Sequence, residues 1–114
     1  MIELIVKNFL ESKLSVPVLM ERPSDCSQYV LIEKTGGGQE NHIPSAMLTI
    51  QSYEISMQKA AELNEKVKHW MLDGMEGLIT LNEVAKVELN ADYNYTDTTT
   101  KEYRYQAVYD IIFY

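Results

Sequence analysis

Cysteine is nearly absent from this chain: Cys26 is the only one among 114 residues. A single thiol cannot form an intrachain disulfide, and it supplies only one ligand where a cysteine-type zinc site needs several. Packing and hydrogen bonds must therefore hold the fold together. A chain without disulfides suits a reduced compartment, and we expect bacterial or host cytoplasm.

Long apolar runs are also missing. No run of about 18 apolar residues occurs, so the sequence predicts no membrane-spanning helix. The first residues, Met1-Ile2-Glu3, lack the basic leader of a signal peptide, and charged residues interrupt the apolar positions that follow. We therefore expect the mature protein to begin at Met1 and to stay in the compartment where it is made.

Basic residues are scarce. Ten lysines and arginines face seventeen acidic residues, which gives a net charge of −7. Sequence-independent binding to nucleic acid requires cations that displace phosphate counterions, and docking on an anionic membrane also requires cations. Both function classes are therefore disfavoured. The apolar share of 46% and the charged share of 24% are those of a globular protein, and the length suits one domain, residues 1–114.

The hydrophobic pattern predicts two helices and five strands. Apolar residues three and four apart mark a helix over residues 2–14, which Pro17 ends. A second helix starts after Ser56, a suitable N-cap, and ends before Gly74. Alternating or β-rich runs predict strands over residues 16–20, 29–33, 43–53, 84–90 and 103–113. The order α-β-β-β-α-β-β predicts a single two-layer α+β domain, with both helices packed on one face of a mixed, mostly antiparallel sheet of about five strands.

Between the second and third predicted strands lies the segment Thr35–His42, with glycines at positions 36, 37 and 38. Three consecutive glycines lose much entropy when they become ordered, so we predict a flexible hairpin loop. A phosphate-binding loop needs Gly-Lys-Ser or Gly-Lys-Thr before a helix, whereas this segment leads into a strand. A small hydrolase or nucleotide-binding enzyme that uses the glycine loop is the alternative from another class.

Residues that could carry catalysis or bind a metal are dispersed along the chain. Neither His42 nor His69 has a cysteine or a second histidine at metal-ligand spacing. Cys26 lies in a turn with no histidine nearby in sequence, and the carboxylate pairs are those expected of an acidic chain. We therefore predict no catalytic site, no metal site and no cofactor.

Tyrosine is present in excess. Six of the eight tyrosines follow position 92, on the last two predicted strands and their connection. Alternation in the last strand assigns Tyr103, Tyr105 and Tyr109 to the helix-covered core, and it places Arg104 and Gln106 on the exposed face. Tyrosines stabilise a sheet through cross-strand pairs, and Tyr and Arg are also enriched at protein–protein interfaces, so both interpretations stay open. Arg104 is the strongest candidate for an interface residue.

Four stretches, in their order and spacing, resemble the tail terminator (tail completion) proteins of long-tailed siphophages and their prophage relatives. They are the glycine segment Gly36-Gly37-Gly38 with Asn41, the strand Ala46–Tyr53, the helix motif Ala60-Ala61-Glu62-Leu63-Asn64, and the ending Tyr103–Tyr109. The resemblance covers most of the chain, from the N-terminal helix to Tyr114. Head-completion and neck proteins of similar size are close neighbours of this family, and a generic intracellular interaction module is a further alternative.

The resemblance implies a structural protein rather than an enzyme. Such proteins form a hexameric ring on the head-proximal end of the tail tube, stop tube polymerisation and provide the surface to which the head joins. The implied partners are further copies of this chain, the major tail tube protein and the head–tail connector protein, while DNA passes through the bore without specific binding and no membrane is involved. The implied location is the virion tail, after the host bacterial cytoplasm. The implied contact residues are Gly36, Gly37, Gly38 and Asn41, Asp97 in the tip at residues 94–101, and Arg104 and Gln106 of the last strand.

Overall fold

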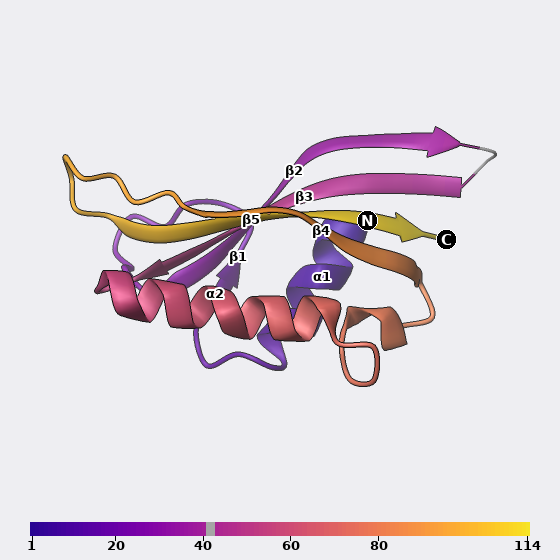
Figure 1. Cartoon of the computed structure of the whole chain (residues 1–114), viewed down its shortest axis with the longest axis horizontal. Coiled ribbons are helices and arrows are strands. Elements are labelled where there is room, and N and C mark those ends of the chain that lie inside the picture. Colours follow the sequence, from indigo (N-terminus) through magenta and orange to yellow (C-terminus); the bar gives the residue numbers. More distant parts are fainter. Residues whose placement is uncertain (41–42) are drawn as a thin grey trace.

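The computed structural model describes residues 1–40 and 43–114 of the chain. Its helices and long strands follow the order predicted from the sequence, with one short 3-10 helix added before the fourth strand (Figure 1). The elements are α1 (Ile2–Glu11), β1 (Val18–Leu19), β2 (Tyr29–Glu40), β3 (Ile43–Glu54), α2 (Met57–Leu72), the 3-10 helix η1 (Leu78–Thr80), β4 (Val84–Asn94) and β5 (Tyr103–Phe113).

The strands form one five-stranded sheet in the order β1-β2-β3-β5-β4. The short strand β1 lies parallel to β2 and pairs only with Val30 and Leu31. All other neighbouring strands are antiparallel. Figure 1 shows α1 and α2 on the same side of the sheet. The chain is therefore a two-layer α+β domain, which confirms the predicted fold class.

The hydrophobic core fills the space between the helices and the sheet face that they cover. Its buried members include Ile2, Val6 and Leu10 of α1, Leu63, Val67 and Met71 of α2, Leu48 and Ile50 of β3, and Ala107, Tyr109 and Ile111 of β5. The alternation in β5 is thus confirmed at positions 107, 109 and 111. Burial of an aliphatic or aromatic side chain of this size contributes about 1.5–3 kcal/mol, so this layer is the main source of stability.

Polar side chains of α2 form hydrogen bonds with the edge strand β4. The amide of Asn64 donates a hydrogen bond to one carboxylate oxygen of Asp92 at 2.7 Å, and Lys68 donates to the other at 2.6 Å. The hydrogen bond to Asp92, with a second one to Glu65, raises the pKa of Lys68. A strand that pairs on one side only is therefore held from below by the helix.

The glycine segment differs from the prediction of a flexible loop. Gly36, Gly37 and Gly38 belong to β2 and pair with Met47, Ala46 and Ser45 of β3, after an irregularity in register between Lys34 and Gly36. The loop prediction is therefore wrong for Thr35–Glu40, because the ladder with β3 supplies backbone hydrogen bonds that offset the entropy lost by glycine. Asn41 and His42 lie outside the described residues.

Among the described residues, no helix is both long and apolar enough to cross a lipid bilayer. The longest one, α2, has sixteen residues and carries charged side chains.

The buried hydroxyl of Tyr109 is a polar group within the apolar core, and its removal tests how much an unpaired group there costs. Its side chain is fully buried, burial raises its pKa, and the hydroxyl has no hydrogen-bond partner among the described residues. An unpaired buried polar group costs about 1–3 kcal/mol, so Tyr109→Phe should raise the free energy of unfolding by about 1 kcal/mol in urea denaturation. The control is Tyr53→Phe, which should lower it because that hydroxyl is hydrogen-bonded. Equal losses in the two variants would contradict the expectation.

Candidate interaction surface

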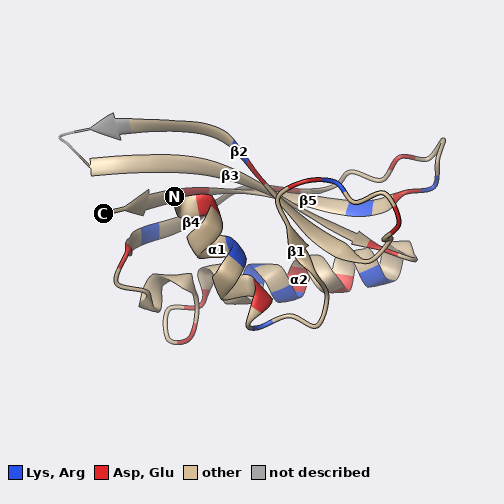
Figure 2. Ribbon diagram, turned by 180° about the vertical axis from the view of Figure 1, so that it is seen from behind, with Lys and Arg blue, Asp and Glu red and all other residues tan. Residues whose placement is uncertain are grey.

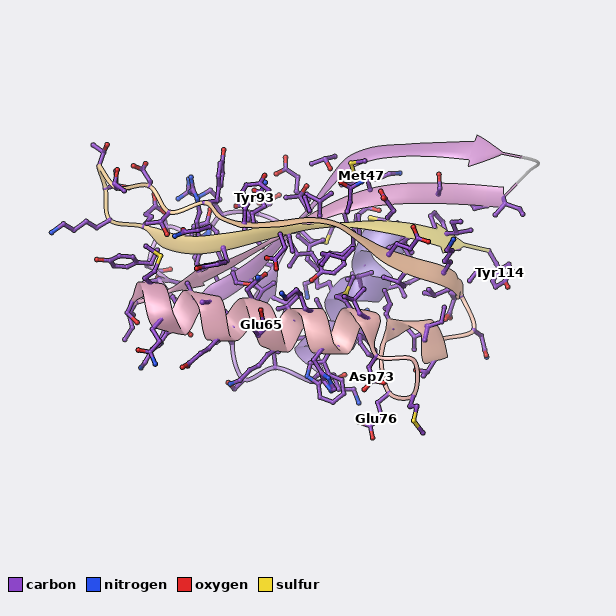
Figure 3. All side chains as sticks on the ribbon, viewed as in Figure 1. Met47, Glu65, Asp73, Glu76, Tyr93 and Tyr114 are labelled. Atoms are coloured by element: carbon purple, nitrogen blue, oxygen red, sulfur yellow. The ribbon has the colours of Figure 1, made fainter. Side chains whose placement is uncertain are left out.

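The sheet face turned away from the helices carries a group of aromatic and arginine side chains. We call it the tyrosine–arginine cluster; its members are Arg22, Tyr29, Tyr53, Tyr93, Tyr95 and Arg104. The strand register brings them together, because Tyr53 pairs with Tyr29 of β2 on one side and with Arg104 of β5 on the other. Figure 3 shows the labelled Tyr93 on the side of the sheet opposite α2.

Arg104 lies at the centre of this cluster. Its guanidinium carbon is 4.7 Å from the ring centre of Tyr95 and 5.6 Å from that of Tyr53. Its Nε donates to the backbone oxygen of Tyr95 at 2.8 Å, and its Nη1 donates to the hydroxyl of Tyr53 at 3.1 Å. A cation over aromatic faces contributes about 0.5–2 kcal/mol, in addition to the hydrogen bonds that fix its direction.

A chain of hydrogen bonds continues from Arg104 across three strands. The hydroxyl of Tyr53 donates to Gln51 at 2.8 Å, and the amide of Gln51 donates to the side-chain oxygen of Gln106 at 2.6 Å. The amide of Gln106 donates in turn to the hydroxyl of Tyr93. Each of these side chains supplies a hydrogen-bond partner for the next one, so the network fixes their relative positions.

The segment between β1 and β2 covers one end of the cluster. The rings of Tyr29 and Tyr53 stack with their centres 4.4 Å apart, and Arg22 lies 5.7 Å from the Tyr53 ring centre. Arg22 also forms an ion pair with Glu102 of the β4–β5 connection. Burial raises the pKa of Tyr29, although its contact with Arg22 opposes the rise. Both arginines of the chain thus converge on Tyr53.

Two of the predicted contact residues are less accessible than the sequence indicated. Gln106 is only 9% exposed, and Arg104 is half-buried. The prediction of a freely exposed face at these positions is therefore wrong. Strand alternation does place them opposite the core, but it cannot report that neighbouring tyrosines and Gln51 cover them.

Asp97 lies in the tip that connects β4 to β5. Its carboxylate accepts hydrogen bonds from the backbone N–H of Thr99 at 2.9 Å and of Thr100 at 3.4 Å. These bonds, chiefly the one from Thr99, hold the pKa of Asp97 below its ordinary value. A backbone bridge to Glu102 closes the tip. Asp97 therefore orders the tip, and its partners are within the tip itself.

The structure separates the predicted contact residues into two groups. Arg104, Gln106 and Asp97 lie at one end of the sheet, whereas Gly38 lies level with Ser45, eight residues along β3 from the partner of Arg104. That separation is roughly 26 Å at about 3.3 Å per residue. The glycine segment and the tyrosine–arginine cluster are thus two distinct surfaces.

A shallow groove of about 470 Å³ opens on the cluster. Its lining combines Arg22 and Arg104 with Tyr53, Tyr95 and Gln51, and two carboxylates, Glu21 and Glu33, form part of its wall. Guanidinium groups and tyrosine rings recognise carboxylates and flat side chains, while the lining contains no histidine, serine or cysteine that could act as a nucleophile. Tyrosine and arginine, which line this groove, are residue types enriched at protein–protein interfaces.

One group of potential metal ligands occurs elsewhere in the described residues. His69, Asp73 and Glu76 place their ligand atoms within 4.8 Å of one another at the C-terminal end of α2, where Figure 3 labels Asp73 and Glu76. Asp73 accepts a hydrogen bond from the N–H of Met75 at 2.8 Å, which lowers its pKa, and it lies 3.6 Å from His69. These contacts are those of a helix terminus.

Sequence reasoning missed the residues that position Arg104. Tyr53 and Gln51 are two residues apart in the third predicted strand and so share one face of it, but only the register with β5 brings them beside Arg104 and Gln106. Arg22 and Cys26 carried no such signal, since both precede β2 in an irregular segment whose path only the tertiary structure defines. There the thiol of Cys26 donates to the backbone oxygen of Gln28 at 3.3 Å.

Removal of the Arg104 side chain should destabilise the fold. Arg104→Ala loses a hydrogen bond to a tyrosine, one to a backbone oxygen and two ring contacts. Because hydrogen bonds from a charged group contribute about 1.5–3 kcal/mol, the free energy of unfolding should fall by about 2 kcal/mol. Lys86→Ala is the control, because that side chain is 58% exposed and such changes usually stay within about 0.5 kcal/mol. Urea denaturation of both variants measures the difference. Coincident unfolding curves for Arg104→Ala and the parent would mean that the network carries no stability.

Comparison with known proteins adds no family assignment. No protein-family model matches the chain. A search of curated proteins likewise finds no match.

Proposed function

We propose that this chain is a structural virion protein of a phage or prophage that forms a ring on the head-proximal end of the tail tube. In this role it stops tube polymerisation and provides the surface to which the head joins. The observation that carries the proposal is the order and spacing of the four family-like stretches. The described residues of these stretches fall on β2, β3, α2 and β5 of one α+β domain. The proposed partners are the major tail tube protein and the head–tail connector protein.

The tyrosine–arginine cluster supports a role in association. Tyrosine and arginine are enriched at the energetic centres of protein interfaces, and the hydrogen-bond network holds them in place before any partner arrives. Tyr93 and Tyr95 keep 42% and 46% of their surface exposed beside the half-buried Arg104. A partner would thus meet ordered aromatic side chains, whose immobilisation costs little further entropy.

The charge of the chain suits a ring through which DNA slides. The net charge is −7, and Figure 2 shows acidic and basic segments interspersed along α2 and in the connections rather than gathered in a basic face. Such a surface does not retain a phosphate backbone. A neck or head-completion protein of the same virion shares these properties and is the second candidate.

The alternative of a nucleotide-binding enzyme loses its structural basis. That reading requires the glycines to form a loop before a helix, whose N–H groups would surround a phosphate. Gly36, Gly37 and Gly38 instead pair with β3, and the strand continues into the hairpin. Their N–H groups do not form a loop at a helix N-terminus.

Reconstitution with tail tubes tests the proposed function. The chain should be mixed with the polymerising tail tube protein of the same phage or prophage, and electron microscopy should then show shorter tubes with a ring at one end. Bovine serum albumin at the same concentration is the control for non-specific shortening. Tubes of unchanged length, with no density added at either end, would refute the role in tail termination.

A second test concerns DNA. At physiological salt, fluorescence anisotropy with a labelled duplex should detect no binding, because few phosphates can be neutralised by ten basic residues among seventeen acidic ones. A protein known to bind duplex DNA, measured with the same labelled duplex, is the positive control. A salt-sensitive complex of the parent chain at micromolar concentration would contradict passage of DNA through the bore without binding.

A further inference from the structure

The sheet has two edges whose backbone groups are open to pairing. β1 covers β2 only at Val30 and Leu31, so within residues 1–40 and 43–114 no strand lies against the outer edge of β2 from Glu33 to Glu40. At the opposite side of the sheet, β4 pairs with β5 alone. An open edge presents unpaired N–H and C=O groups and can accept a further strand.

Two of the three glycines on the β2 edge, Gly36 and Gly38, are not required by the fold of this chain, whereas a Cβ atom at Gly37 would lie only 3.1 Å from the backbone oxygen of Ser45. None of them has a positive φ angle. A Cβ atom added at Gly36 would lie 3.5 Å from the Cβ of Met47, and one at Gly38 would lie 3.7 Å from the hydroxyl of Ser45, which are ordinary contacts. Glycine within a strand weakens it, and it often marks a place where another chain approaches closely. Packing within the monomer thus accounts for Gly37, but it does not account for Gly36 and Gly38.

The two edges differ in how they are protected. Between Thr35 and Gly38 the β2 edge carries no charge and no proline, which are the usual guards against pairing with another chain. The β4 edge carries Lys86 and Glu88, but these charges neutralise each other in an ion pair at 2.6 Å, and the segment is regularly paired with β5 between the two irregularities in register. The β2 edge thus carries no side chain of its own from Gly36 to Gly38, although the Lys34 side chain lies beside Gly37, whereas the β4 edge carries two long side chains at the corresponding level.

The glycine segment of β2 and the Lys86–Glu88 segment of β4 lie on opposite edges of the sheet, at the same position along the strands. Gly38 pairs with Ser45, Ser45 with Ile112, and Ile112 with Lys86. A second row joins Gly36, Met47, Asp110 and Glu88 in the same way. When a second copy is placed beside the first without a shift along the strands, Lys86 and Glu88 of one copy lie next to Gly38 and Gly36 of the other.

The strand directions also match. Because β2, β3, β5 and β4 alternate in direction, β4 of one copy runs antiparallel to β2 of a neighbour in the same orientation. Antiparallel pairing is the more favourable arrangement, and a contact between unlike edges repeats from copy to copy until it closes into a ring. Pairing between two β2 edges would end at a dimer.

We propose that the glycine edge of β2 accepts the Lys86–Glu88 part of β4 from a second copy of this chain, which joins the subunits into a continuous sheet. The inference rests on the proposed ring and names the surfaces that would form it. The glycines leave room for the long side chains of Lys86 and Glu88. Leu89, 39% exposed in the monomer, becomes covered by the neighbouring strand.

Disulfide cross-linking tests this pairing directly. In a Cys26→Ser background, the double variant Gly38→Cys with Lys86→Cys places one thiol on each edge, and neighbouring residues on paired strands have the Cα separation that a disulfide needs. After mild oxidation, denaturing non-reducing gels should show a ladder of covalent multimers. The experiment is run at high protein concentration over a range of salt, and again on tail tubes. The cross-linked fraction should exceed that of the control pair by about tenfold or more, because paired strands hold the thiols at a high effective concentration.

Three controls separate pairing from collision. Gly38→Cys alone and Lys86→Cys alone should give little cross-linking, and the pair Gly38→Cys with Lys66→Cys moves one thiol to the exposed side of α2. Thermal melts check that each variant folds. Dimers from Gly38→Cys alone would show that two β2 edges meet, and this result would overturn the proposal. A ladder no stronger than that of the α2 control, in solution and on tubes, would overturn it as well.

The same experiment distinguishes this inference from the proposed function. If the parent chain caps tail tubes but the Gly38–Lys86 pair does not cross-link there, the ring exists and the proposed edges are wrong. If the ladder forms in solution while tubes are unaffected, the pairing is correct and the role in tail termination is wrong.

Discussion

Strand β5 is paired on both sides, and the two faces of the sheet depend on the alternation of its side chains. Tyr109 faces the helices between Leu48 of β3 and Leu89 of β4, whereas Gln106 faces outward between Gln51 and Tyr93. A shift of one residue in this register would exchange the two faces and bury Arg104 in the core. The core and the outer surface are therefore specified together, by one strand.

The outer face is stabilised both by a small apolar cluster, in which Tyr29, Leu31 and Tyr53 are buried, and by polar contacts. Its charged and amide side chains are paired with one another or with the backbone, which avoids the penalty of half-buried groups without partners. The arrangement also makes the surface rigid, because Arg104 is fixed between two tyrosine rings. A rigid surface loses little entropy when a partner binds, and this property suits the proposed role in assembly.

The sheet closes on neither side within the described chain, and its edges are unequal. α2 holds β4 through Asp92, while β2 continues past the two residues covered by β1 as a bare glycine strand. Charge opposes association of identical subunits at −7 each, and screening by salt weakens this repulsion. In the proposed ring, ordered edges and a repulsive net charge would together favour assembly on a template over association in free solution.

The sequence by itself determined the element order, the α+β class and the core residues of β5 from Ala107 to Ile111, because apolar periodicity records which side of a helix or strand is buried. Tyr103 and Tyr105, which the same alternation assigned to the core, are only partly buried and lie outside it. It did not determine the conformation of Gly36–Gly38. Their glycine content alone predicts a loop, and only the pairing with β3 makes this segment a strand. It also could not show that Arg22, Tyr53 and Arg104 meet, because they come from an irregular segment and two strands separated by a helix. Local patterns report burial, whereas contacts between distant segments follow from strand order and register, which exist only in the folded chain.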